Sequence, residues 1–131
     1  MPLIVPAGID LPLEYVTRVW YAVGPTSTTS SVIMSITAQI PDGAAVWQLV
    51  AFDARRFSPM GDTEVWLGVG NRESLPVRVT SIREDLHRHH FLQHLWLNLP
   101  AGTHTFELRQ EAGGGGAILY RPHMALLLLK R

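Results

Sequence analysis

Four of the six histidines lie close together in the sequence, at His87, His89, His90 and His94. On an extended strand His87 and His89 would project to one face, an arrangement that can supply two metal ligands. The chain has no cysteine, and the nearby carboxylates have no recognisable ligand spacing. We therefore expect no metal site and no cofactor, and interpret the cluster as a solvated loop or a subunit contact. A pH-sensitive contact is the alternative, because clustered imidazoles titrate near neutrality.

No catalytic constellation is recognisable in the sequence. The serines within 27–35 lack the glycine frame of a nucleophile elbow, and no two glutamates are marked as a glycosidase pair. The four glycines of 113–116 are not followed by Lys-Ser or Lys-Thr, so they do not form a phosphate-binding P-loop. We predict a protein that is not an enzyme and has no catalytic residues.

The tryptophans raise the question of a sugar site, because aromatic rings can stack on saccharides. Each of them falls inside an extended segment, where tryptophan usually fills a core or an interface. A sugar site would more typically place its tryptophans in loops. A carbohydrate- or receptor-binding module is therefore kept as the alternative function, with a glycan as the alternative ligand. The four residues are Trp20, Trp47, Trp66 and Trp96.

Composition narrows the class of protein. A chain of 131 residues with 47% hydrophobic residues can bury the core of one domain. Only 17% of the residues are charged, below the typical quarter, which suggests that partners cover part of the surface. The formal net charge of zero argues against nucleic acid as a partner. No stretch resembles a signal peptide or reaches transmembrane length, so we expect no membrane partner.

The pattern of the chain predicts an all-β fold. Apolar and polar residues alternate through 32–40 and 103–110, and Pro41-Asp42-Gly43 has the composition of a tight turn. Short strands separated by such turns are typical of an antiparallel β-sandwich, and we expect a jelly-roll in a single domain over 14–131. Segment 83–90 is either a polar loop or a helical turn. The expected strands are 14–23, 32–40, 44–52, 63–69, 76–82, 91–99, 103–110, 117–121 and 123–130.

Residues 1–13 form a separate element. They contain three prolines, which exclude a helix and predict an extended arm. The arm is too apolar for a free tail, so it packs either on its own domain or across a neighbouring subunit. The residues we expect to contact a partner are Leu3, Ile4, Val5, Ile9 and Leu11.

The segment LPAGTHTFELRQEAGGGGAILYRPHMALLLL, which begins at Leu99, resembles the C-terminal pattern of small jelly-roll virion proteins of tailed bacteriophages. These are proteins of the decoration, head-fibre or tail-tip type. The pattern is also similar in outline to tumour-necrosis-factor-like jelly rolls, which form trimers.

This resemblance implies a structural protein of a phage or phage-like virion that stabilises the assembly by adhesion between subunits, for example in capsid decoration. It further implies a homotrimer that contacts other virion proteins such as a major capsid protein. The expected location is the virion, and the host cytoplasm during assembly.

Overall fold

The computed structural model describes residues 15–26, 31–56, 62–80, 88–111 and 117–130. These residues contain nine strands and no helix, so none of them belongs to a helix that could span a membrane. The predicted arm 1–13 lies outside the described residues. The strands are β1 (Tyr15–Val23), β2 (Val32–Ile40), β3 (Ala44–Arg56), β4 (Asp62–Val69), β5 (Arg72–Glu73), β6 (Val77–Thr80), β7 (Arg88–Leu99), β8 (Gly102–Gln110) and β9 (Ala117–Lys130).

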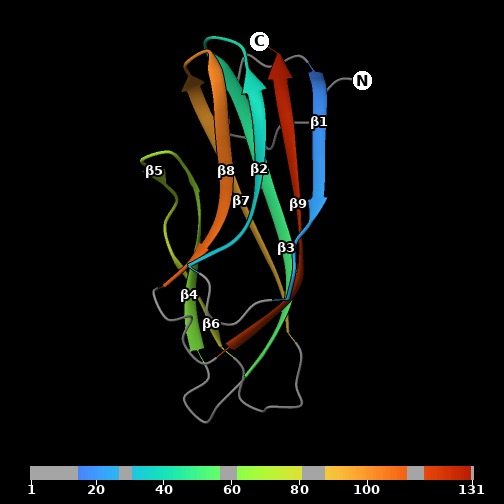
Figure 1. Ribbon diagram of the computed structural model, residues 1–131, viewed down its shortest axis with the longest axis vertical. Coiled ribbons are helices and arrows are strands. Elements are labelled where there is room, and N and C mark those ends of the chain that lie inside the picture. Colours follow the sequence, from blue (N-terminus) through green and yellow to red (C-terminus); the bar gives the residue numbers. More distant parts are fainter. Residues whose placement is uncertain (1–14, 27–30, 57–61, 81–87, 112–116, 131) are drawn as a thin grey trace, which may run out of the picture.

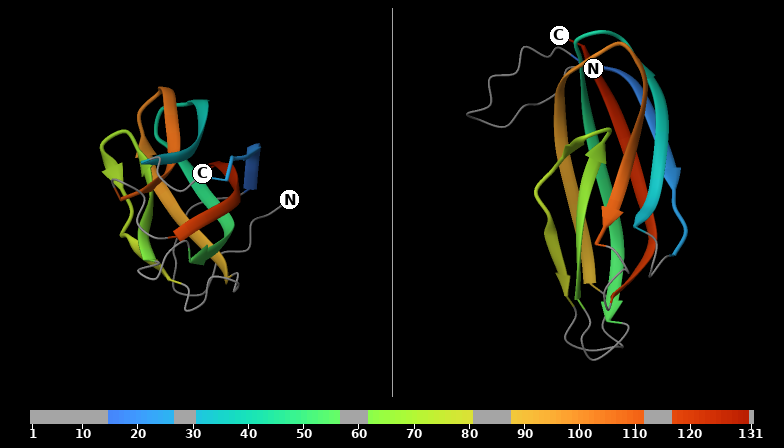
Figure 2. Two further views of the ribbon diagram at one scale, coloured as in Figure 1. Left: turned by 60° about the horizontal axis from the view of Figure 1, so that its bottom comes forward. Right: turned by 60° about the vertical axis from the view of Figure 1, so that its left-hand side comes forward.

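The strands form two antiparallel sheets packed face to face, and most of them run along the long axis of the molecule (Figures 1 and 2). Sheet A has the order β1-β9-β3-β7, and sheet B has the order β2-β8-β4-β5, with β6 also paired to β4. The chain changes sheet between β1, β2, β3 and β4, and again between β6, β7, β8 and β9. This winding of antiparallel strands around a sandwich is the jelly-roll arrangement, which confirms the predicted fold class.

The core lies between the two sheets and is built from the alternate residues that face inward. On β3 these include Val46 and Val50, and on β8 they are Phe106 and Leu108, all of which are fully buried. Burial of such side chains stabilises a fold by about 1.5–3 kcal/mol each. The alternation that predicted the strands from sequence is therefore the alternation that fills the core.

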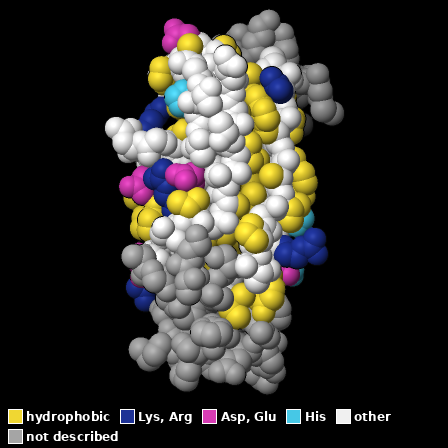
Figure 3. Space-filling view, viewed as in Figure 1, with side chains coloured by type: hydrophobic (Ala, Val, Ile, Leu, Met, Phe, Trp, Pro, Cys, Tyr) yellow, Lys and Arg dark blue, Asp and Glu magenta, His cyan; other side chains and the backbone are white. Residues whose placement is uncertain are grey.

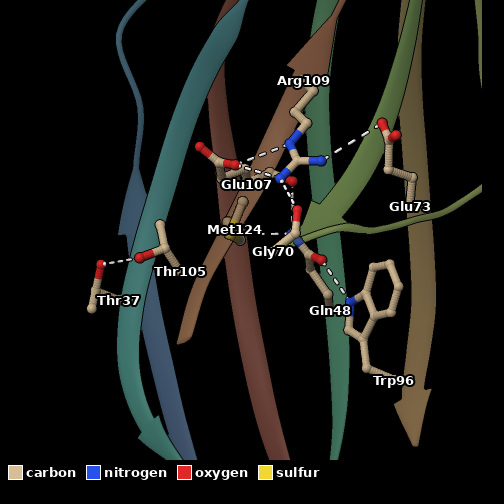
Figure 4. Close-up of polar contacts among 9 residues, drawn as sticks. All are labelled: Thr37, Gln48, Gly70, Glu73, Trp96, Thr105, Glu107, Arg109 and Met124. Carbon is tan, nitrogen blue, oxygen red and sulfur yellow. Dashed lines mark hydrogen bonds and ion pairs between the residues drawn. The ribbon is translucent and has the colours of Figure 1, made fainter. Parts of the chain in front are cut away.

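One polar side chain lies at the centre of this core. Gln48 of β3 is completely buried. Its Nε2 donates a hydrogen bond to the backbone carbonyl of Glu107 on β8, at 3.1 Å, and its Oε1 accepts one from Trp96 Nε1 of β7, at 2.9 Å. A single amide thus joins three strands and connects sheet A to sheet B (Figure 4).

The structure corrects several predicted strand ends. The predicted loop or helical turn at 83–90 is wrong in its last part, because β7 begins at Arg88. β3 continues to Arg56, four residues beyond its predicted end. The short strand β5 was not predicted, since two exposed polar residues carry no periodicity.

Two corrections come from β-bulges, which insert an extra residue and break strict alternation. The predicted strands 117–121 and 123–130 are one strand, β9, whose register against β3 shifts opposite Ala51 and Asp53. His123 therefore lies inside β9 and does not open it. On β2 the register shifts between Val32 and Met34, so strict alternation fails there: the neighbouring residues Ile33 and Met34 are both buried, and Val32 is exposed.

The Gln48 network yields a stability prediction. We expect Gln48→Leu to lower the free energy of unfolding by about 1–3 kcal/mol, because it leaves the buried N–H of Trp96 without its acceptor. Adding Trp96→Phe should recover part of this loss, since both polar partners are then removed. Urea unfolding of the two single variants and the double variant measures this. Losses that simply add would show that the two side chains are not coupled.

Candidate functional site

The outer faces of the two sheets differ in chemistry. The outer face of sheet B is polar: the hydroxyls of Thr37 and Thr105 lie 3.0 Å apart in a hydrogen bond, and Arg109 pairs with Glu107 at 2.7 Å and with Glu73 at 3.6 Å. Figure 4 shows these side chains paired with one another across the strands. Their polar groups already have partners within the chain. This part of the surface therefore needs no second molecule and can remain in contact with water.

The Arg109 side chain fits closely over β4 because of a glycine beneath it. A Cβ atom at Gly68 would lie 2.4 Å from the Arg109 guanidinium carbon, so only glycine leaves room for this approach. Arg109 also donates to the Gly70 carbonyl at 3.0 Å, and its side chain is only 18% exposed. This arginine is therefore a structural group of sheet B and is not available to bind a ligand.

The outer face of sheet A is mostly apolar, and we call its main part the apolar face. The strand register places its residues in rows across β1, β9, β3 and β7. Figure 3 views the molecule from the side of sheet B, and in it hydrophobic side chains gather along the margin beside β1, which is the edge strand of sheet A. The apolar face consists of Val19, Tyr21, Ala125, Leu127, Trp47, Leu49, Phe91 and Leu95.

Several of these side chains are unusually exposed. Tyr21 is 62% exposed, Phe91 59% and Val19 55%. The indole N–H of Trp47 donates to the Gln93 side chain at 3.0 Å, so the polar atom of this tryptophan is paired along the surface. Contiguous apolar surface of this kind marks an interaction site in soluble proteins.

The opposite end of the same outer face is polar and hollowed. A hollow of about 440 Å³ lies there, and we call it the polar hollow. Its lining residues are Ala51, Phe52, Asp53, His89, His90, Tyr120, Arg121 and His123. Asp53 and His89 form an ion pair, and the Tyr21 hydroxyl forms a hydrogen bond with Nδ1 of His123. The small side chain of Ala51 lies between His123 and Phe91 in the register and leaves the space open.

The bulge in β9 shapes this hollow. Arg121 has a φ of 40°, in the left-handed region that favours glycine, and its N–H donates to the Thr26 hydroxyl at 3.3 Å. Pro122 is buried while Arg121 and His123 are exposed, and β9 bends near its beginning (Figure 1). Bulges redirect side chains next to functional sites, and here the bulge brings Tyr120, Arg121 and His123 to one hollow.

The predicted histidine cluster is divided between the two faces of β7. His89 lies on the outer face in the polar hollow, whereas the half-buried His90 stacks on Phe52 with ring centroids 5.4 Å apart. His94 also faces inward, 4.2 Å from the Trp96 ring. His87 lies outside the described residues. Within the described ranges, no three His, Asp or Glu side chains come together in a way that could hold a metal ion.

The local environment of His94 alters its titration. Burial lowers the pKa of His94 below its ordinary value of 6.5, and the positive charge of Arg72 lowers it further. Arg72 is held in place by a hydrogen bond from its Nη1 to the Leu97 carbonyl, at 2.9 Å. A neutral imidazole is therefore the preferred form of His94 in the folded chain.

The remaining sequence predictions have mixed outcomes. All four tryptophans lie in strands as predicted, but only Trp96 is fully buried, and Trp20, Trp47 and Trp66 are partly exposed. The five predicted partner-contact residues of the arm lie outside the described residues, so their role stays a prediction. The polar hollow was missed because its members come from three strands.

The sequence matches no protein-family model and none of the curated proteins. Solved structures show the same fold. The tripod (BppUct-A-L) from the baseplate of bacteriophage Tuc2009 has a TM-score of 0.54 at 14% identity, with all of this chain and 78% of that chain covered. Dimeric latent PorU from Porphyromonas gingivalis has a TM-score of 0.53 at 9% identity; the alignment covers 99% of this chain, which spans 14% of the PorU chain.

Carbohydrate-binding modules are also among the structural neighbours. A family 35 module from Clostridium thermocellum has a TM-score of 0.44 at 9% identity, with 84% of this chain and 89% of the module covered. The neighbours thus include a phage baseplate component and sugar-binding β-sandwiches. The likeness to the Tuc2009 tripod and to PorU, at 14% and 9% identity, shows the fold alone.

The lowered pKa of His94 yields a pH prediction. Because the folded state holds this proton less tightly than the unfolded chain, stability is fully present above about pH 6.5 and falls as the pH drops below it. We expect His94→Gln to make the melting temperature fall less between about pH 7.5 and about pH 5.5. His104→Gln on sheet B is the matched control. An unchanged pH dependence in His94→Gln would contradict the assignment.

Proposed function

We propose that this protein is a non-enzymatic structural component of a phage or phage-like virion, and that it acts by adhesion between its own copies. The apolar face of sheet A is the observation that carries this proposal. In the single chain Tyr21, Phe91 and Val19 remain more than half exposed on this face. A second copy seated there would remove these side chains from water, at about 25 cal/mol per Å² of apolar surface.

The N-terminal arm gives the adhesion a second element. β1 begins at Tyr15, which pairs with Lys130 at one end of sheet A. A segment of 13 residues reaches at most about 45 Å when extended, and four strands about 4.8 Å apart are narrower than that. The apolar residues Leu3, Ile4, Val5, Ile9 and Leu11 can therefore reach across the sheet of a neighbouring copy. We assign the partner contacts to this arm and the apolar face together.

The virion assignment rests on the resemblance of residues 99–129 to small virion jelly rolls, and the fold shared with the Tuc2009 baseplate tripod agrees with it. The same resemblance favours a homotrimer and contact with further virion proteins such as a major capsid protein. The protein would then reside in the virion, after assembly in the host cytoplasm. The low charge of the chain, 17%, also agrees with a surface that partners cover.

A carbohydrate- or receptor-binding module is the second candidate function. The polar hollow favours it, because tyrosine, histidine, arginine and aspartate side chains around a concave surface can hydrogen-bond a polar ligand. Binding in the hollow with a chain that is monomeric at all concentrations would favour the module over the adhesion protein.

The first prediction concerns the oligomer. We expect the purified chain to have the mass of a trimer by light scattering, and Val19→Lys with Phe91→Ser to shift it toward the monomer. Both side chains are exposed in the single chain, so the fold should survive, while a charge in a dry interface costs several-fold to more than tenfold in affinity. Thr103→Lys, on the outer face of sheet B, is the control and should leave the mass unchanged. A monomeric parent chain at micromolar concentration would count against self-adhesion.

The second prediction concerns the arm. Deletion of residues 1–12 should leave the far-ultraviolet circular dichroism spectrum of a β-sandwich intact. It should lower the number of chains per particle, as measured by light scattering. The physical reason is that the deleted residues carry apolar contacts to a neighbour. An unfolded product would assign the arm to the core of its own domain. A folded product with an unchanged number of chains per particle would show that the arm is not part of the interface.

A further inference from the structure

The polar hollow has features that adhesion between copies does not require. It lies at the end of sheet A opposite to the Tyr15–Lys130 pair, where β9 bends and the outer face becomes polar. Its wall is made by residues from three strands, with Asp53 on β3, His89 on β7 and His123 on β9. Its floor is Ala51, the smallest side chain of that row, so the space is open because a small residue stands between large ones.

The charges in the hollow are unevenly satisfied. The carboxylate of Asp53 is paired with His89, and the ring nitrogen Nδ1 of His123 is engaged by the Tyr21 hydroxyl. Arg121 is exposed, and within the described part of the chain no carboxylate pairs with its guanidinium. The hollow therefore presents the guanidinium of Arg121 beside a carboxylate, that of Asp53, whose Oδ1 contacts Nδ1 of His89.

The backbone at Arg121 supports a functional reading. A non-glycine residue with a φ of 40° is held in a sparsely populated conformation, and such strain is concentrated at binding and catalytic sites. Glycine would adopt this conformation at lower cost. An arginine at this position is therefore unfavourable for the fold, and its side chain is the part that a ligand would use.

We infer that the polar hollow binds a small saccharide that carries a phosphate or carboxylate group. The guanidinium of Arg121 supplies paired N–H donors whose geometry matches such an anion. The imidazoles of His89 and His123 lie around the same space, and ring nitrogens of this kind can hydrogen-bond sugar hydroxyls. The volume of about 440 Å³ is within the range that holds a ligand of one or two sugar rings.

The test is a titration of ¹⁵N-labelled protein followed by amide chemical shifts. The probes are glucose 6-phosphate and glucuronate, with glucose as the uncharged sugar and inorganic phosphate as the anion without a sugar. We expect at least one charged sugar to shift the amides of Tyr120, Arg121 and His123, with affinity about tenfold higher than glucose or phosphate. Equal binding of free phosphate would overturn the saccharide part, and no shift at these amides with any probe would overturn the site.

Two variants separate the ligand contact from the fold. Arg121→Gly should lose the binding while its melting temperature stays equal to the parent's or rises, because the backbone strain is relieved. Arg18→Gln, an exposed arginine on β1 that lies over Trp20, is the matched control and should bind like the parent. Unchanged binding in Arg121→Gly would overturn the role of Arg121.

The inference is independent of self-association. A chain that binds the charged sugar as a monomer would support the site and contradict the adhesion proposal. A trimer that binds none of the four probes would do the opposite.

Discussion

The buried amide of Gln48 is the interaction on which the arrangement of the two sheets depends. It accepts the indole N–H of Trp96 within sheet A and donates to the backbone of β8 in sheet B. A polar group in a hydrophobic core is stabilising only when its partners are in place, and leaving one unpaired costs about 1–3 kcal/mol. The apolar side chains around it would tolerate small changes in the position of one sheet over the other. The hydrogen bonds of Gln48 fix that position and, with it, which residues reach the outer faces.

The position of the sheets then produces two outer faces with different requirements. The outer face of sheet B carries hydroxyls and ion pairs that satisfy one another. Arg109, which lies over Gly68, belongs to these ion pairs. The outer face of sheet A carries mostly aliphatic and aromatic side chains. These side chains can be removed from water only by contact with another surface. An antiparallel sandwich with one polar and one apolar outer face is suited to assembly. This asymmetry, more than any single residue, links the fold to the proposed role in a virion.

The sequence was sufficient to predict the fold class because the core obeys period two. The inward residues of β3 and β8 alternate with outward ones, and the turn at Pro41-Asp42-Gly43 falls where its composition places it, with Gly43 at a φ of 70°. The strand ends were less predictable. β7 begins in a segment of charged and imidazole side chains that have low strand propensity, and only its pairing with β3 makes Arg88 to His90 part of the sheet.

The candidate site was beyond prediction for a related reason. Its residues come from three strands that are far apart in the chain, and they meet because β3 lies between β7 and β9 in the sheet. The histidine-rich segment attracted attention in the sequence, yet alternation sends His89 outward and His90 and His94 inward. The cluster in the sequence is therefore not a cluster in space, and His123, which does join His89, was expected to begin a separate strand.

The bulge at Arg121 shows how one irregularity can create a binding surface on an otherwise regular sheet. In an unbroken strand neighbouring residues point to opposite faces, so a sheet surface presents every second residue. The extra residue in β9 allows Tyr120, Arg121 and His123 to line the same hollow while Pro122 stays buried. The cost is the left-handed backbone at Arg121, which a glycine would reduce. A chain under no demand except stability would favour glycine there, and the presence of arginine is the strongest physical reason to look for a ligand at this end of the sandwich.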